Sequence, residues 1–176
     1  MKRKIKILIT CIGGKYTFDL VRSIKATKNF KIDVFGADVN PKAKAPFVKK
    51  IFKIPKPIKQ KIYLKKMLSI CKKNKINIIF PGSEEEANII SKNRKIFNKS
   101  KISAIISDYK TVSYLNDKGK MMEFLNKKNI NVGKWKNINS NKELKKALNF
   151  LGYPRKKIVL KQRKGSGSRG VIILDN

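Results

Sequence analysis

The segment from Val159 to Val171 contains the residues best suited to chemistry. Its sequence places three glycines and two serines between Gly165 and Gly170, flanked by basic side chains. Glycine lets backbone N–H groups turn toward a ligand, and serine hydroxyls add further hydrogen-bond donors. Such a loop suits the binding of phosphate groups, and a flexible hairpin tip is the alternative interpretation. The basic residues are Lys161, Arg163, Lys164 and Arg169.

Three other features could carry chemistry, and each also has a structural explanation. Gly13-Gly14 and Asp38 resemble a dinucleotide-binding turn, but the Gly-x-Gly-x-x-Gly spacing is absent. We favour a turn that the topology requires, or part of a substrate pocket at the strand ends. The acids from Glu84 to Glu86 are either pocket residues or, as we favour, residues stabilised at a helix N-terminus. Cys11 is either a reactive thiol or, as we favour, a small buried residue.

The elements that must position these residues alternate between strands and helices as far as residue 107. Short β-branched runs predict strands at 4–10, 31–37, 51–54, 77–80 and 103–107. Helical spacing of apolar residues predicts a helix at about 17–27 and a second one containing Tyr63, Met67, Leu68 and Cys71. Ser83 is expected to cap a third helix. This alternation predicts a doubly wound parallel sheet.

The pattern changes after Asp108. Helices are expected at 109–115, at 117–128 and from a Ser140 cap to Leu151, with an extended segment at 131–136. Strands at 157–162 and 171–174 are joined by a loop, which predicts a hairpin. Trp135 and the pair Met121-Met122 are interpreted as packing residues. The domain boundary is expected near residues 107–117.

The composition excludes several classes of protein. The 176 residues include 44 Lys+Arg, 11 Asp+Glu and no His, which gives a formal charge of +33. Without histidine there is no Ser-His or Cys-His catalysis, and two cysteines are too few for a disulfide framework. No apolar run is long enough to cross a membrane. Lysine supplies 38 of the basic residues, and they are spread along the chain. We therefore favour codon bias over selection for a polyanion as the origin of the charge.

A resemblance to a known family becomes visible at the glycine-rich loop. Lys161, followed by Gly-Ser-Gly-Ser-Arg-Gly-Val, resembles the phosphate-covering hairpin of the ATP-grasp family, and more narrowly its carbamoyl-phosphate-synthase-like branch. The resemblance extends over nearly the whole chain. Its further motifs are Gly13-Gly14, Asp38-Val39-Asn40, Ala45-Pro46, Phe80-Pro81-Gly82-Ser83-Glu84, Asp117-Lys118, Asn129-Ile130-Asn131-Val132 and Leu151-Gly152-Tyr153-Pro154.

The resemblance implies an α/β fold in two parts. Residues 1–110 would form the Rossmann-like parallel-sheet domain that precedes the ATP-grasp domain. Residues 111–176 would form the incomplete start of the ATP-grasp domain, with helices and a β-hairpin. Two departures from the family pattern bear on the subfamily more than on the fold. Gln162 stands where proline often follows the lysine, and Glu85-Glu86 replaces the usual Asp-Glu-Leu-like sequence.

The resemblance also implies roles for individual residues. Lys161 matches the strand lysine that contacts nucleotide phosphates, and Lys118 matches a basic residue that also reaches the nucleotide. Residues 165–170 match the mobile loop that closes over the β- and γ-phosphates, where it would shield phosphoryl transfer from water. The expected nucleotide-binding residues are Lys118, Lys161, Arg163, Gly165, Ser166, Gly167, Ser168, Arg169 and Gly170.

In this family the adenine-binding strand and the Mg²⁺-binding carboxylates follow the glycine-rich loop. Beyond Glu123 the sequence holds only two acids, Glu143 and Asp175. We therefore assign no catalytic and no metal-binding residue, and we expect the chain alone to be inactive. We expect the N-terminal part of a longer enzyme, a truncated reading frame, or one half of a split enzyme that a C-terminal chain or a homodimer would complete. The apolar residues 171–174 and their open sheet edge predict either poor stability or a need for a complementing chain.

Three interpretations remain open at this point, and the third of them is a non-catalytic remnant that would show neither of the two binding activities described next. The first is the N-terminal portion of an ATP-dependent ligase, in which a small carboxylate is activated as an acyl phosphate and captured by an amine or ammonia, with ATP and Mg²⁺ as cofactors. The second is a basic Rossmann-like module that binds nucleic acid or another polyanion through its lysines. We favour the ligase, and expect a cytoplasmic protein with no specific nucleic-acid partner and no membrane attachment.

Overall fold

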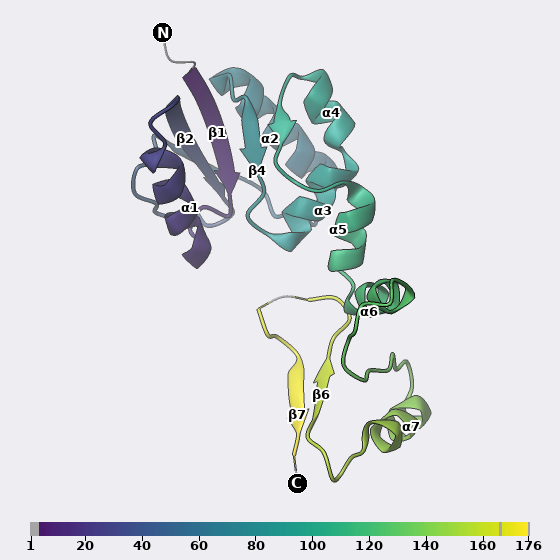
Figure 1. Ribbon diagram of the computed structural model, residues 1–176. Helices are drawn as coiled ribbons and strands as arrows, with labels where there is room; N and C mark the ends of the chain where they lie inside the picture. The colour runs from purple at the N-terminus through teal and green to yellow at the C-terminus, as the bar shows by residue number, and fades with distance from the viewer. Residues whose placement is uncertain (1–3, 166, 176) are drawn as a thin grey trace. The chain divides into compact units, whose positions relative to one another are not determined.

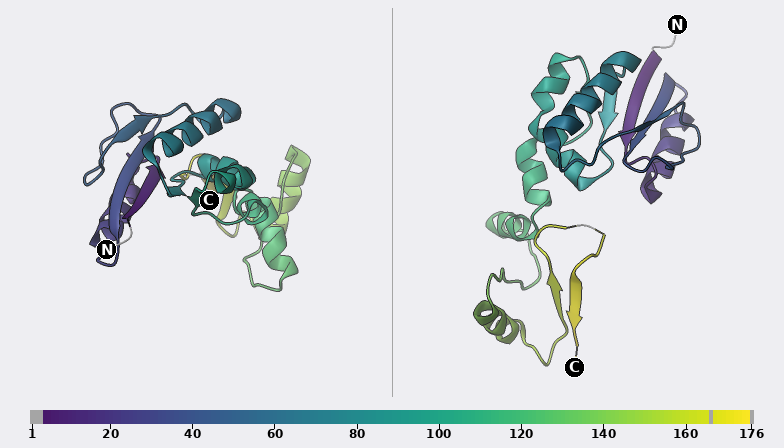
Figure 2. Two further views of the ribbon diagram at one scale, coloured as in Figure 1. Left: turned by 90° about the horizontal axis from the view of Figure 1, so that it is seen from above. Right: turned by 180° about the vertical axis from the view of Figure 1, so that it is seen from behind.

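The computed structural model describes residues 4–165 and 167–175 (Figures 1 and 2). The chain divides into two compact units, Met1–Val112 and Ser113–Asn176. The division falls within helix α5 (Tyr109–Leu115). None of the helices in the described ranges has the length and apolar character that crossing a membrane requires.

The first unit is built on a five-stranded parallel sheet with the order β3-β2-β1-β4-β5. The two longest strands, β1 (Lys4–Thr10) and β2 (Lys31–Asp38), pair in register from Lys4 opposite Lys31 to Thr10 opposite Ala37. The shorter strands are β3 (Ile51–Lys53), β4 (Ile78–Phe80) and β5 (Ser103–Ala104). The prediction of a parallel α/β sheet is confirmed.

Helices cover both faces of this sheet, and each face has its own apolar core (Figure 1). Helix α1 (Lys15–Ala26) packs through Val21 against Ile7 and Ile9 of β1. The opposite face, with Leu8, packs against α2 (Gln60–Asn74), α3 (Glu84–Lys92) and α4 (Arg94–Lys99). Alternate residues of β1 thus point to different cores, as the period of two in a strand requires.

Helix α4 is absent from the sequence-based prediction. It is only six residues long, which is too short for helical periodicity to show in the sequence. Its Phe97 is fully buried in the same core as Leu8. Burial of this one aromatic side chain, rather than local propensity, accounts for the helix.

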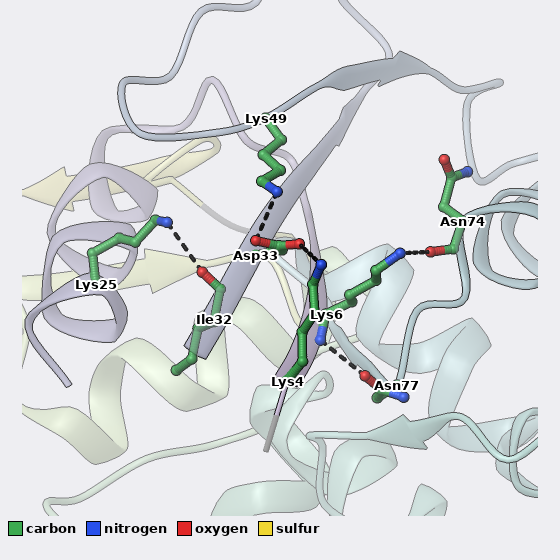
Figure 3. A network of polar contacts seen from close by, with 8 residues as sticks. All are labelled: Lys4, Lys6, Lys25, Ile32, Asp33, Lys49, Asn74 and Asn77. Atoms are coloured by element: carbon green, nitrogen blue, oxygen red, sulfur yellow. Dashed lines mark hydrogen bonds and ion pairs between the residues drawn. The ribbon is translucent and has the colours of Figure 1, made fainter. Parts of the chain in front are cut away.

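Two lysines, one on β1 and one in the segment that precedes β3, contact a buried carboxylate on β2 (Figure 3). The carboxylate of Asp33 on β2 is almost fully buried. It forms ion pairs with the ammonium groups of Lys49 at 2.8 Å and Lys4 at 3.4 Å. The hydrogen bond from Lys49 and the charges of both lysines outweigh the effect of burial and hold the pKa of Asp33 below its usual value. Some of the positive charge of the chain therefore has a structural role.

The second unit contains two helices and a hairpin. Helices α6 (Lys118–Lys127) and α7 (Asn141–Leu151) begin at the N-caps Asp117 and Ser140, whose side chains accept hydrogen bonds from backbone N–H groups. Strands β6 (Ile158–Lys161) and β7 (Val171–Leu174) form an antiparallel pair, with Lys161 opposite Val171. The predicted hairpin is confirmed.

Candidate functional site

A buried carboxyl group lies at the carboxyl end of the parallel sheet in the first unit. The Glu86 carboxyl group accepts hydrogen bonds from Thr10 Oγ1 at 2.6 Å, Tyr63 OH at 3.0 Å and Ser83 Oγ at 3.1 Å. Burial raises the pKa of Glu86, and the three hydroxyl donors only partly oppose this effect. Because its partners come from β1, α2 and the α3 N-cap, Glu86 joins three elements of the unit.

The acids at 84–86 therefore do not have one common role. Ser83 caps α3 by accepting a hydrogen bond from the backbone N–H of Glu86 at 3.3 Å, as predicted. Glu84 and Glu85 are acids in the first turn of that helix, where the helix dipole favours them. Glu86 is instead enclosed by its own hydroxyl donors. The sequence indicated the helix start but not this network.

The Asp38 side chain stabilises the glycine turn after β1 by accepting hydrogen bonds. Asp38 Oδ2 accepts a hydrogen bond from the backbone N–H of Gly13 at 2.9 Å, and Oδ1 accepts one from the N–H of Asn40 at 2.8 Å. Both carboxylate oxygens are thus engaged by neighbouring amides. This geometry favours the structural explanation of Gly13-Gly14 and Asp38 over a dinucleotide-binding turn.

Cys11 differs from both interpretations of the sequence. It is half-buried rather than buried, and its backbone has a φ of 51°. Burial and the nearby charges of Glu86, Asp38 and Glu85 raise the pKa of its thiol. A raised pKa keeps the thiol protonated, which is the opposite of what a reactive cysteine needs.

The second unit contains a cavity of about 390 Å³ that brings together residues from α6, β6 and the intervening segment. Three of the predicted nucleotide-binding residues line it, namely Lys118, Lys161 and Arg163. Within the described residues, the ammonium group of Lys161 has no hydrogen-bond or ion-pair partner. The remaining lining residues are Gly119, Met121, Met122, Trp135, Lys136, Asn137 and Val159.

The start of α6 is fastened to the residues that follow β6. The N-cap Asp117 accepts hydrogen bonds from Arg163 Nε and Nη2, both at 3.0 Å. The backbone N–H of Lys118 donates to the carbonyl oxygen of Arg163 at 2.9 Å. The side-chain ammonium group of Lys118 donates to the carbonyl oxygen of Gly165 at 2.7 Å.

Burial opposes ionisation of the Asp117 carboxyl group, which is only 4% exposed. The hydrogen bonds and charge of Arg163, together with the backbone N–H of Lys120, outweigh burial and lower the pKa of Asp117. Asp117 is therefore a carboxylate at neutral pH, and it faces a guanidinium group along the edge of the cavity.

The glycine-rich loop adopts a backbone that glycine makes possible. Gly165, Gly167 and Gly170 have φ values of 139°, 66° and 68°. A Cβ atom at Gly170 would lie 2.6 Å from Cδ of Gln162, so the Gln162 side chain packs closely against the end of the loop. Ser168 is also in the left-handed region, at 58°.

The other predicted loop residues do not line the cavity. Lys164, Ser168 and Arg169 are exposed, and Ser166 lies outside the described residues. The structure therefore brings Lys118, Lys161 and Arg163 together and leaves residues 167–170 of the loop exposed to solvent.

Sequence reasoning missed several residues of this cavity. Trp135 is half-buried and lines the cavity, which its interpretation as a packing residue did not indicate. Met121 and Met122 are also half-buried and line it. At Gly119 a Cβ atom would lie 2.5 Å from Asn137 Oδ1 and 3.0 Å from Arg163 Nε. A glycine directly after the Asp-Lys pair was the one signal of this close approach.

No group of three or more His, Cys, Asp or Glu residues within 4–165 and 167–175 is placed to hold a metal ion. The described carboxylates near the cavity are engaged with other side chains. Asp117 binds Arg163, and Glu123 accepts a hydrogen bond from Asn137 Nδ2 at 2.9 Å. The described part of the chain therefore supplies basic groups for a phosphate, but no oxygen cluster for a cation.

Solved structures with the same arrangement include the biotin carboxylase domain of Hydrogenobacter thermophilus 2-oxoglutarate carboxylase, a dimer in complex with MgADP, ADP and bicarbonate. Its TM-score is 0.68 at 18% identity, with 96% of this chain and 37% of that chain covered. A Campylobacter jejuni biotin carboxylase–β-γ-ATP complex has a TM-score of 0.66 at 21% identity, with 97% and 38% covered.

An L-amino acid ligase from Bacillus licheniformis also matches, with a TM-score of 0.66 at 14% identity and coverage of 100% of this chain and 40% of that chain. The chain thus spans about two fifths of the length of these structures. At such identities the likeness shows the fold alone. No curated protein matches the chain significantly.

The parallel sheet followed by helices and a hairpin is an arrangement that this chain shares with these solved structures. Residues 7–106 match the model of the PylC-like N-terminal domain, and the chain belongs to that family. The predicted resemblance to the N-terminal part of ATP-grasp enzymes is confirmed, while the narrower carbamoyl-phosphate-synthase-like assignment stays a prediction.

Proposed function

We propose that the second unit binds the phosphate groups of ATP in the cavity between α6 and β6. The observation that carries this proposal is the convergence of Lys118 and Lys161 on one cavity from two separate elements. Both lysines were singled out by their sequence context alone. Two ammonium groups in one hollow attract a multiply charged anion, and the repulsion between them is relieved when it binds.

The surroundings of the two lysines are favourable for a phosphate. Lys118 is the first residue of α6, where the positive end of the helix dipole adds to its charge. Its ammonium group uses one N–H for the Gly165 carbonyl oxygen, and two N–H donors remain for a ligand. The loop from Gly165 to Gly170, with its positive φ angles, would add backbone N–H donors on closing.

The hairpin face that carries Lys161 also suits the less polar part of a nucleotide. The register places Lys161 opposite Val171 and Val159 opposite Ile173, so these four side chains share one face. Val159, Val171 and Ile173 are exposed by 48%, 38% and 64%. We propose that the base and sugar of ATP lie along this apolar surface, next to the lysine that holds the phosphates.

We further propose that the chain is the N-terminal portion of a carboxylate–amine or carboxylate–ammonia ligase of ATP-grasp type, with a carbamoyl-phosphate-synthase-like reaction as the narrower possibility. Family membership and the fold support the ATP-grasp part of this proposal. Mg²⁺ would accompany ATP, but none of the described residues is assigned as its ligand. A small carboxylate would be the second substrate.

Trp135 offers a direct test, because it is the only tryptophan in the chain and lines the cavity. Titration with ATP is expected to change its fluorescence, and inorganic tripolyphosphate is expected to compete. Lys161→Ala and Lys118→Ala should each weaken binding about tenfold or more, since each removes a charge-assisted hydrogen bond. Lys142→Ala, at an exposed position of α7, is the matched control and should bind like wild type.

The polyanion hypothesis makes a different prediction for the same titration. Binding through distributed lysines would weaken equally in Lys142→Ala and Lys161→Ala, and it would fall steeply with salt concentration. That result, or the absence of any ATP effect on Trp135, would contradict the proposed site.

A further inference from the structure

We propose that Asp117 and Arg163 are positioning residues of the nucleotide site, which together hold the base of the glycine-rich loop against the start of α6. This inference rests on the proposed function for the ligand, but its geometry stands independently. The sequence pattern counted Arg163 among the residues that contact the nucleotide. The structure instead directs its guanidinium group to a carboxylate.

The contact between the two side chains is a bidentate pair. Arg163 Nε donates to Asp117 Oδ1 and Arg163 Nη2 donates to Asp117 Oδ2, both at 3.0 Å. A planar guanidinium group meets a carboxylate in this way with two parallel hydrogen bonds, which an ammonium group cannot reproduce. The Asp117 side chain is 6% exposed and that of Arg163 is 43% exposed, so solvent reaches the pair from the guanidinium side only.

Asp117 also fixes the helix that carries Lys118. Its Oδ1 accepts a hydrogen bond from the backbone N–H of Lys120 at 3.1 Å, which makes it the N-cap of α6. One carboxylate thus holds both the first turn of α6 and the residue that leaves β6. Lys118, which follows directly, is placed by the same contacts.

Two further hydrogen bonds join α6 to the loop, and together with the Asp117–Arg163 pair they form what we call the clamp. The N–H of Lys118 donates to the carbonyl oxygen of Arg163 at 2.9 Å, and the Lys118 ammonium group donates to the carbonyl oxygen of Gly165 at 2.7 Å. Gly119 allows this approach, because a Cβ atom there would lie 3.0 Å from Arg163 Nε. The loop therefore leaves β6 from a fixed point next to both lysines.

A direct phosphate contact by Arg163 would have to use the guanidinium N–H groups that do not bind Asp117. Two of its N–H groups already donate to Asp117, whose negative charge compensates the guanidinium group and would repel a phosphate. The positioning role and the direct-ligand role therefore predict opposite results for conservative substitutions.

The test measures ATP affinity through Trp135 fluorescence in the full chain for Arg163→Lys and Asp117→Asn. Lysine keeps the charge and could still pair with a phosphate, but it loses the bidentate geometry. Asparagine keeps the N-cap of α6 but loses the ion pair. Positioning predicts that both variants bind ATP about tenfold more weakly. Arg155→Lys, the same change at an exposed position outside the cavity, is the control and should bind like wild type.

A second measurement does not depend on a ligand. The Lys118 amide donates across the clamp, so its hydrogen exchange, followed by NMR in the absence of ATP, reports whether the clamp is closed. In Arg163→Lys and in Asp117→Asn this amide should exchange about tenfold faster than in wild type and in Arg155→Lys. The exchange rates of amides in the centre of α2 should be unchanged.

The outcomes separate the inference from the proposed function. If wild type does not bind ATP but the Lys118 amide is deprotected in both variants, the nucleotide site fails and the clamp stands. If ATP affinity is retained in Arg163→Lys and retained or increased in Asp117→Asn, the positioning role is wrong. Unchanged exchange of the Lys118 amide in both variants would also overturn it.

Discussion

Each of the two units contains a buried acidic side chain, and their partners are of different kinds. Glu86 in the first unit accepts hydrogen bonds from three neutral hydroxyl groups, and burial raises its pKa. Asp117 in the second unit is paired with a guanidinium group, which overcomes burial and lowers its pKa. One acid is held by neutral donors and the other by a cation.

The difference indicates which unit is arranged to receive an anion. In the first unit the polar groups around Glu86 form hydrogen bonds with one another. The carboxylate oxygens of Asp38 accept hydrogen bonds from backbone amides. These polar groups hold together the ends of the strands. In the second unit, by contrast, Lys118 and Lys161 face an open cavity, and Lys161 has no partner among the described residues. The first unit is therefore a scaffold, and the second carries the candidate site.

The largest expected effect is on the free energy of unfolding, and it distinguishes a core residue of the first unit from an exposed residue of the hairpin. Ile79 is fully buried in the first unit, so Ile79→Ala should lower the free energy of unfolding by about 2–5 kcal/mol. Ile173 on the hairpin is 64% exposed, and Ile173→Ala should stay within about 0.5 kcal/mol of wild type. Urea denaturation measures both. Equal losses would contradict the contrast between a packed scaffold and an open hairpin.

The next largest effects are expected when one glycine in each unit is replaced by alanine. A Cβ atom at Gly82 would lie 2.1 Å from the carbonyl oxygen of Thr10, which is backbone and cannot move aside, so Gly82→Ala should cost about 1–3 kcal/mol. At Gly119 the obstacle is the Asn137 side chain, and alanine favours the helix by about 1 kcal/mol.

Gly119→Ala should therefore leave stability nearly unchanged while it weakens ATP binding. Denaturation and Trp135 fluorescence separate the two effects, with Gly133→Ala, where no atom lies within 4 Å of the added Cβ, as the control. A Gly119→Ala variant that binds ATP like wild type would show that the close approach at α6 is not needed for the site.

Glu86 gives the first unit a pH dependence of known sign. Because its pKa is raised on folding, the folded state holds the proton more tightly than the unfolded state does. The contribution of Glu86 to stability is therefore present below its unfolded pKa and is lost as the pH rises through the folded pKa. Glu86→Gln should remove this part of the decline in denaturation curves recorded from pH 4 to 8. An unchanged slope would contradict the raised pKa.

Asp117 has the opposite sign, and its effect is confined to acid. Its pKa is lowered on folding, so its contribution is present above the unfolded value of about 3.8 and is lost as the pH falls through the folded pKa. The protection factor of the Lys118 amide, which is its intrinsic exchange rate divided by its observed rate, should fall on acidification in wild type but not in Asp117→Asn, where the clamp is already open. The same fall in both proteins would separate the clamp from the ionisation of Asp117.

The sequence predicted those parts of the molecule that depend on local signals. Ser83, Asp117 and Ser140 marked three helix starts, and Gly-Gly and Pro-Gly turns marked strand ends. Lys118 and Lys161 were found because they stand in recognisable motifs. Helix α4 was missed because its six residues are held by the burial of Phe97, which is a tertiary effect.

The sequence also could not reveal the hydrogen-bond partners of Glu86 and Asp117. Glu86 meets Thr10 and Tyr63 only after the sheet has formed, and Asp117 meets Arg163 across 46 positions of the chain. Trp135 was placed in a core because a single aromatic residue in an extended segment does not reveal that it borders a cavity. In each case the missing information is long-range contact, not propensity.

The most direct test of the central claim is to map ATP onto the chain by amide chemical shifts at physiological salt, in wild type and Lys161→Ala. The account predicts that wild-type shifts are confined to residues 117–119, 135–137 and 159–171, and that Lys161→Ala removes them. Shifts at the strand ends around Gly13 and Glu86, or shifts spread over lysines throughout the chain, would contradict it.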